Sequence, residues 1–167
     1  MKKTNSTLNK QTSTARNIEQ YAKDYTHADN DFELSVMVHF RRQKVLEILR
    51  YYKPKSILEI GCGMRSIFDF YFDYERFVVV EPSELFCASI AKSKHYNPKI
   101  TIIKDFLENQ LTALQKEKFD FIVLSGLLNE VPSPREFLQV VAKLCDKDTI
   151  LHFAVPNQQS NTFEEWR

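Results

Sequence analysis

Glycine is scarce in this chain, with only three among 167 residues, at positions 61, 63 and 126. Two of them stand in one short phrase, Gly61-Cys62-Gly63, directly after the apolar run that begins at residue 56. Glycine has no Cβ, so it lets the backbone turn sharply or lie against a ligand. A chain this poor in glycine that places two of them after a predicted buried strand indicates a ligand-binding turn at that point.

Cysteine and long apolar runs are also lacking. The three cysteines, Cys62, Cys87 and Cys145, form no CxxC or Cys/His pair, so they predict neither a disulfide framework nor a metal site. No apolar run approaches the roughly 20 residues that cross a bilayer, and the N-terminus has lysines without the apolar core of a secretory signal. We therefore expect a cytoplasmic protein with no membrane partner.

An excess of one charge is absent as well. Lys and Arg number 23 against 22 Asp and Glu, for a formal net charge of +1. Such a chain has no general positive field to hold a nucleic-acid backbone, which argues against a nucleic-acid partner. The length fits one domain with a substantial core, and the composition leaves the oligomeric state open.

Three segments follow one another along the chain. Residues 1–20 are polar and have little to bury, so we expect a flexible tail. Apolar positions at helical spacing predict a helix over 33–52, ended by Pro54, within an N-terminal helical cap segment of residues 21–54. In residues 55–167 strands and helices alternate. The predicted strands are 56–60, 77–80, 100–103, 119–124 and 149–155, and the predicted helices are 66–72, 82–93, 106–115 and 134–145.

This alternation predicts an α/β fold, a Rossmann-like doubly wound and mostly parallel sheet with helices on both faces. Ligands of such sheets bind at the carboxyl ends of the strands, near the point where strand order reverses. Candidate binding residues stand at four of these ends. They are Glu59, Gly61, Cys62 and Gly63 after the first strand, Glu81 and Pro82 after the second, Asp105 and Phe106 after the third, and Ser125 and Gly126 after the fourth.

The chemistry of these residues fits a ligand that contains adenosine. The carboxylate of Glu81 can accept hydrogen bonds from both ribose hydroxyls. Asp105 can accept from the exocyclic amine of adenine, or it can cap the helix that follows. Phe106 offers a flat face to a base, or it belongs to the core. The order of these groups along four successive strands carries more weight than any one of them.

At these positions the chain resembles the class I S-adenosylmethionine-dependent methyltransferases. Residues 57–63 (ILEIGCG) are similar to their first motif, and 80–83 (VEPS) to the acidic end of their second strand. Residues 104–106 (KDF) are similar to their adenine-contacting motif, and 119–125 (FDFIVLS) to the motif of their fourth strand.

The resemblance implies that 55–167 is an S-adenosylmethionine-binding domain and an enzyme. Glu59 and the turn glycines would line the methionine part of the cofactor, and Glu81 would hold the ribose. Asp105 and Phe106 would bind adenine, and the Ser125 backbone would lie near the methionine amino group. The methyl group would pass to an oxygen or nitrogen of a small molecule, such as a sugar or a surface-polysaccharide unit.

The chain departs from this family in three places. Arg65 stands where a third glycine is usual, and Asn129-Glu130 stand where many members have a histidine. The family also adds an antiparallel strand pair after strand five, so we expect the fold to be truncated there, with C-terminal strands missing.

A catalytic base does not follow from the motifs. A base is needed when the acceptor is a hydroxyl, and a lone titratable residue is more often a surface or core group than a catalyst. Arg41 and Arg42 could pair with a phosphate or the cofactor carboxylate, or they could form a solvated helix face. The candidate bases are Glu130, His39 and Tyr25, with Tyr21 and His152 as further choices.

Two other functions remain open from the sequence. The spacing Gly61-x-Gly63-x-x-Ser66 nearly satisfies the dinucleotide fingerprint of a nicotinamide-dependent oxidoreductase, although the Glu59 carboxylate would repel a pyrophosphate. Arg65 and Asn129 favour a non-catalytic module that binds the cofactor without transferring its methyl group.

Overall fold

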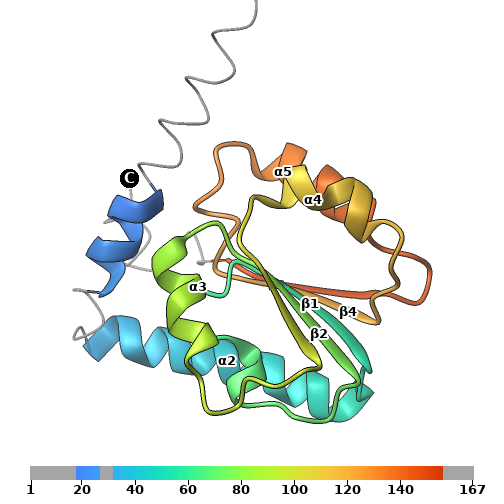
Figure 1. The fold of residues 1–167 in the computed structure, drawn as a ribbon, viewed down its shortest axis with the longest axis horizontal. Helices are drawn as coiled ribbons and strands as arrows, with labels where there is room; N and C mark the ends of the chain where they lie inside the picture. Colours follow the sequence, from blue (N-terminus) through green and yellow to red (C-terminus); the bar gives the residue numbers. More distant parts are fainter. Residues whose placement is uncertain (1–17, 27–31, 156–167) are drawn as a thin grey trace, which may run out of the picture.

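Five parallel strands form one sheet in the order β3-β2-β1-β4-β5 (Figure 1). The computed structural model describes residues 18–26 and 32–155, and all that follows concerns these residues. The strands are β1 (Ser56–Ile60), β2 (Arg76–Val80), β3 (Ile100–Ile103), β4 (Phe121–Ser125) and β5 (Ile150–Ala154). The predicted Rossmann-like parallel sheet is confirmed.

Helices cover both faces of the sheet (Figure 1). They are α2 (Phe32–Tyr52), α3 (Glu84–Ala91), α4 (Leu107–Leu114) and α5 (Pro134–Ala142), with the short 3-10 helix η1 (Ile67–Asp69) after β1. Residues 18–26 are also helical, so this helix takes in the last three residues of the predicted tail. Among the described helices, none is both long and apolar enough to cross a membrane.

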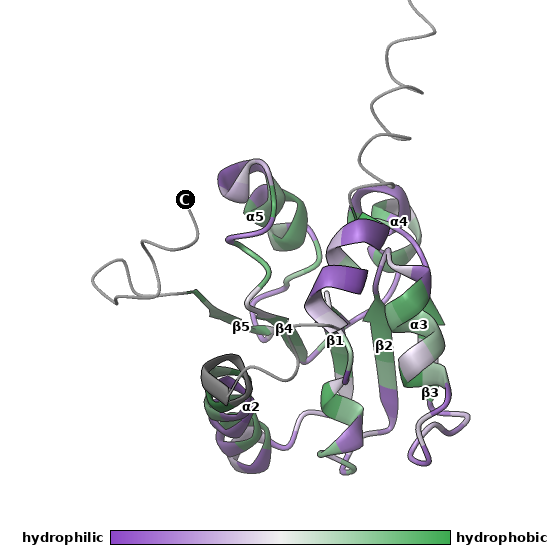
Figure 2. Ribbon diagram, turned by 90° about the vertical axis from the view of Figure 1, so that its left-hand side faces the viewer, coloured by the Kyte–Doolittle hydropathy of each residue, from purple (hydrophilic) through white to green (hydrophobic). Residues whose placement is uncertain are grey.

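The alternation of side chains along the strands divides the core in two, because successive residues of a strand point to opposite faces. One core joins Ile57 and Phe77 of the strands to α2, η1 and α3. The other joins Leu58 and Val78 to α4 and α5. The inner strands are mostly apolar (Figure 2), as expected for a parallel sheet that is buried on both faces.

The order of the strands locates the site. The chain runs outward from β1 to β2 and β3, then crosses back to β4 on the other side of β1. The carboxyl ends of β1 and β4 therefore flank the point of reversal, where ligands of such sheets bind. Gly61 follows β1 at this point, and Gly126 follows β4.

Three predicted helices differ from the structure by two residues or more, and one of them, α5, ends at Ala142 instead of residue 145. The helix predicted over 66–72 is only the single turn η1, because Phe70 leaves the helical region at φ −130°. The next helix, predicted from Pro82, begins at Glu84 instead. Ser83 is its N-cap, and its hydroxyl accepts a hydrogen bond from the Phe86 N–H at 3.3 Å, the usual role of serine at a helix start.

Candidate functional site

The glycine turn is held by its neighbours on both sides. Gly61 and Gly63 have φ of +72° and +61°, a region that side chains other than glycine rarely adopt. The Gly61 N–H donates to the Val80 carbonyl at 2.9 Å, which ties the turn to the end of β2. On the other side, a Cβ on Gly61 would lie 3.1 Å from Cδ1 of Leu127, in the loop after β4. The turn therefore needs glycine for both its conformation and its close packing.

Glu59 supports the turn from inside the protein. Its side chain is buried, and it accepts hydrogen bonds from the Ser66 hydroxyl and, at 3.1 Å, from the Ile67 N–H. Burial raises the pKa of the Glu59 carboxyl from 4.5 to about 7, although these hydrogen bonds oppose the shift. In this arrangement the carboxylate binds the start of η1. The prediction that Glu59 lines the methionine part of a ligand stays a prediction.

Glu81 joins the end of β2 to the glycine turn. Its Oε1 accepts from the Ser83 N–H at 2.9 Å, and its Oε2 accepts from the Gly63 N–H at 3.4 Å. The Cys62 thiol also points at Oε2, 3.8 Å away. Burial raises the pKa of the Glu81 carboxyl. Pro82, half-buried, links Glu81 to the N-cap of α3. The structure thus brings together the residues predicted after the first two strands.

Asp105 is held by the helix that follows it. Its Oδ1 accepts from the Phe106 N–H at 2.8 Å and from Asn109 Nδ2 at 2.7 Å, while Oδ2 accepts from Gln110 Nε2 at 2.7 Å. Burial raises the pKa of this carboxyl, but the three hydrogen bonds outweigh it and the net shift is downward. Oδ2 keeps a free lone pair. Phe106, half-buried, is itself the N-cap residue of α4.

Ser125 ends β4, and Gly126 follows it next to Arg41 of α2. Gly126 has φ +79°, and a Cβ there would lie 2.0 Å from Nη1 of Arg41. Within the described part of the chain, Nε of Arg41 is buried and has no hydrogen-bond partner. An arginine from α2 therefore lies against the glycine after β4 with donor capacity to spare.

Helix 18–26 lies beside α3 (Figure 1). The Glu19 carboxylate accepts from the Glu84 N–H at 2.6 Å and from the Ser83 hydroxyl at 3.5 Å, so it caps α3 from outside. Tyr25 packs edge-on against Phe86, with ring centroids 5.9 Å apart. Glu19 was missed at the sequence level, because it fell within the predicted tail and nothing in its surroundings indicates a cap for a helix that begins 65 residues further on.

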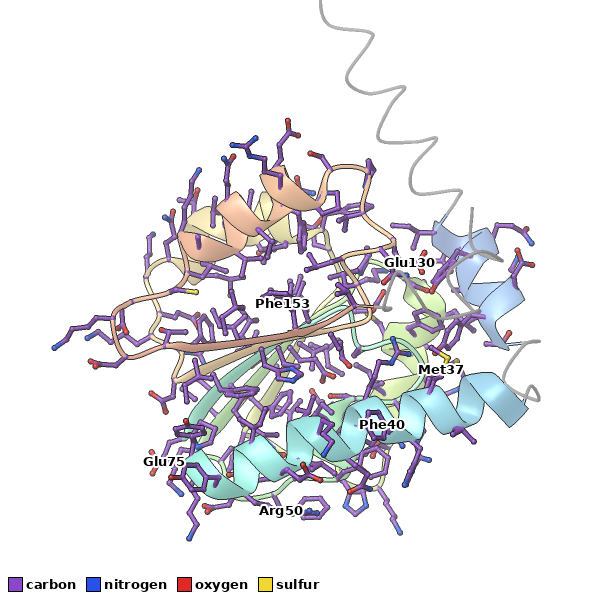
Figure 3. All side chains as sticks on the ribbon, turned by 180° about the vertical axis from the view of Figure 1, so that it is seen from behind. Met37, Phe40, Arg50, Glu75, Glu130 and Phe153 are labelled. Carbon is purple, nitrogen blue, oxygen red and sulfur yellow. The ribbon has the colours of Figure 1, made fainter. Side chains whose placement is uncertain are left out.

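The candidate bases lie in different surroundings. Burial raises the pKa of the Tyr21 hydroxyl, as does the nearby Glu130, while Arg41 opposes the shift. Figure 3 shows Glu130 on the side of the molecule that carries helix 18–26, the helix that includes Tyr21. His39 is exposed on α2. His152, half-buried on β5, stacks on Phe121 of β4, with ring centroids 6.3 Å apart.

The sequence model of the family described as "Methyltransferase domain" matches residues 37–167, and this chain belongs to that family. A ubiquinone biosynthesis O-methyltransferase from Histophilus somni is 24% identical over 155 residues, which cover 89% of this chain and 63% of that protein. A protein of the same name from Actinobacillus pleuropneumoniae is 40% identical over 58 residues, which cover 35% of this chain and 24% of that protein. The chain thus spans less than two thirds of these relatives.

Solved structures share the fold. N-methyltransferase NodS from Bradyrhizobium japonicum, in complex with S-adenosylhomocysteine, superposes with a TM-score of 0.63 at 18% identity, covering 82% of this chain and 72% of that one. The plantazolicin methyltransferase BpumL, also in complex with S-adenosylhomocysteine, gives 0.67 at 17% identity, covering 92% of this chain and 63% of that one. At these identities the likeness concerns the fold.

Proposed function

We propose that this chain binds S-adenosylmethionine at the carboxyl edge of its sheet and transfers the methyl group to an oxygen of a small molecule. The observation that carries the proposal is the contact between Glu81 and the Gly63 N–H, 3.4 Å long, beside the point where strand order reverses. It sets a buried carboxylate against a glycine turn, which suits a ribose with its hydroxyls on the carboxylate and its tail along the turn. The name of the Histophilus relative favours oxygen over nitrogen.

Acceptors and donors along this edge of the sheet would contact the cofactor from end to end. Glu81 would accept from the ribose hydroxyls, and the free lone pair of Asp105 would accept from the adenine amine beside Phe106. Arg41, whose buried Nε has no partner among the described residues, would bind the methionine carboxylate next to the Ser125–Gly126 backbone. The cofactor, when bound, supplies a methyl group already activated by its sulfonium charge.

With the methyl donor activated, the protein's work is alignment and the exclusion of water. Helix 18–26 would cover the cofactor, because Glu19 and Tyr25 fix it to the start of α3. Glu130, in the loop after β4, would take the proton of an acceptor hydroxyl. Burial raises the pKa of its carboxyl while Arg41 opposes the shift, and a carboxyl with a raised pKa is a better base.

A nicotinamide dinucleotide fits this turn poorly. Its pyrophosphate needs free N–H groups at the start of a helix. Here η1 has only three residues, and the Ile67 N–H already donates to Glu59. A second buried carboxylate, Glu81, accepts from the Gly63 N–H, so two acidic side chains already take the N–H groups that the pyrophosphate would need.

Isothermal titration with S-adenosylhomocysteine tests the proposal. We expect one saturable site, and we expect Arg41→Gln to weaken binding by about 1–3 kcal/mol, the cost of a lost charge-assisted hydrogen bond. Arg50→Gln, at an exposed position on the same helix, should leave the affinity unchanged. The absence of binding to the full chain would refute the proposal. Binding without methyl transfer to any of a panel of hydroxylated acceptors would favour the non-catalytic module.

A further inference from the structure

Two arginines share one aromatic ring next to the glycine turn. The guanidinium carbon of Arg42, from α2, lies 4.1 Å from the centre of the Phe70 ring. The guanidinium carbon of Arg65, which follows the turn, lies 4.7 Å from the same centre. Stacking of this kind fixes the plane of each guanidinium while leaving its N–H donors at the rim available. Arginine side chains flex freely in solution, but those of Arg42 and Arg65 are both held against the Phe70 ring.

The nearby acids are already bound to other groups. Asp69 lies 3.9 Å from Nε of Arg65, at the limit of an ion pair, and its carboxylate accepts from the Ser93 hydroxyl. Glu59 accepts from the Ser66 hydroxyl and the Ile67 N–H. Among the described residues, the ion pairing of these two arginines is therefore limited to the long contact between Arg65 and Asp69. Burial and then the proximity of Arg65 lower the pKa of Arg42, while Glu59 and Asp69 oppose the shift.

The position of this pair separates it from the residues assigned to the cofactor. Arg41 and Arg42 are consecutive on α2, and consecutive helical residues point about 100° apart. Arg41 accordingly reaches Gly126 after β4, while Arg42 reaches Phe70 beyond η1. The single carboxylate of the cofactor is served by Arg41, which leaves the charge of Arg42 and Arg65 for a second molecule.

We propose that Arg42 and Arg65, stacked on Phe70, form an oxyanion subsite that binds the acidic group of the methyl acceptor. The inference rests on the proposed function. Guanidinium groups recognise carboxylate and phosphate oxygens with paired N–H donors, and either oxyanion suits the pair. Arg65 stands where a third glycine is usual in the methyltransferase family, so the subsite is a feature of this chain and not of the family. It would restrict the methyl acceptors of this chain to acidic molecules.

The test titrates the protein, first saturated with S-adenosylhomocysteine, with pyrophosphate and with acetate at low ionic strength. We expect one saturable anion site. The ligand that binds more tightly, pyrophosphate or acetate, shows whether the site prefers a phosphate or a carboxylate group. Arg65→Gln should weaken anion binding about tenfold, the effect of losing one charged donor pair. The Arg65 side chain is 60% exposed, so the variant should fold, as circular dichroism can verify.

Two controls make the outcome decisive. Phe70→Leu keeps apolar contact but removes the ring, and it should weaken anion binding while S-adenosylhomocysteine affinity changes less than about twofold. Arg50→Gln should bind anions like the parent chain. The proposal is overturned if no saturable anion site exists, if Arg65→Gln binds like the parent chain, or if pyrophosphate displaces S-adenosylhomocysteine. Failure of S-adenosylhomocysteine to bind would instead refute the proposed function, and titration of the free protein would still test the anion site.

Discussion

Gly126 and Arg41 lie so close together that a Cβ on the glycine would stand 2.0 Å from Nη1 of the arginine. The two residues come from different parts of the chain, one after β4 and the other within α2, and their contact joins α2 to the loop after β4. Gly126 also has a φ of +79°. Its lack of a side chain therefore permits both this backbone conformation and the close approach of the Arg41 guanidinium.

Gly126→Ala should therefore weaken both folding and ligand binding. Forcing alanine into the left-handed region costs about 1–2 kcal/mol, and the Cβ must push the Arg41 guanidinium aside. Gly63→Ala carries the backbone cost alone, because nothing lies within 4 Å of a Cβ there. Urea denaturation of both variants separates the two contributions. Equal losses of stability would mean that displacement of Arg41 costs nothing.

Glu81→Gln should reduce the affinity for S-adenosylhomocysteine by about 1–3 kcal/mol, because the amide replaces one charged acceptor with a donor. The loss should appear in calorimetric titration as a larger dissociation constant with unchanged stoichiometry. Glu84→Gln is the matched control, since that side chain is 68% exposed and pairs with Lys104. If both variants bind like the parent chain, the ribose assignment is wrong.

Glu59 should make stability depend on pH. Burial raises the pKa of its carboxyl from 4.5 to about 7 in the folded protein, so the folded state holds this proton more tightly than the unfolded chain does. The contribution is therefore fully present below about pH 4.5 and is lost as pH rises through about 7. By this linkage the parent chain should lose on the order of 3 kcal/mol from this group across that window.

Glu59→Gln removes the titrating group and is the variant that checks this. The unfolding free energy of the parent chain should fall relative to that of the variant as the pH rises from about 5 to about 8. Denaturant titrations at several pH values measure it. Parallel profiles for the two proteins would show that Glu59 keeps an ordinary pKa in the fold.

Glu19→Ala should release helix 18–26 from α3. The carboxylate accepts from the Glu84 N–H at 2.6 Å, and losing a hydrogen bond to a helix N-cap region costs about 1 kcal/mol. Amide hydrogen exchange over residues 18–26 should become about fivefold faster, the equivalent of that free energy. Lys23→Ala, on the same helix and exposed, is the control. Unchanged exchange in Glu19→Ala would show that the tyrosine packing alone holds the helix.

The sequence predicted the strands of the sheet closely, because each is a short apolar run bounded by turn residues or by prolines. The ends of the helices were less accurate. Pro82 fits the first turn of a helix, yet the Ser83 hydroxyl accepts from the Phe86 N–H and makes Ser83 the N-cap, so α3 begins at Glu84, two residues later than predicted. The helix predicted at η1 was too long. Ile67, Phe68 and Tyr71 are apolar at helical spacing, but the helix ends at Phe70, and Tyr71 lies in the core.

The candidate site divides along the same line. Local patterns locate Glu81 and the glycines at strand ends, since a parallel sheet brings those ends to one edge. Contacts between distant segments have no such pattern. The contact of Glu19 with the start of α3 depends on how helix 18–26 packs, and the contact of Arg42 with Phe70 depends on how α2 packs.

The sequence by itself determined the fold, the glycine turn and the acidic residues at the ends of β1 and β2, because strand periodicity and glycine conformation are local properties. Tertiary structure alone decided what each charge does. It buried Glu59 against η1, set Glu81 on the Gly63 N–H, seated Arg41 over Gly126 and stacked Arg65 on Phe70. Charge partners are chosen by packing across the chain, and a linear sequence does not record that choice.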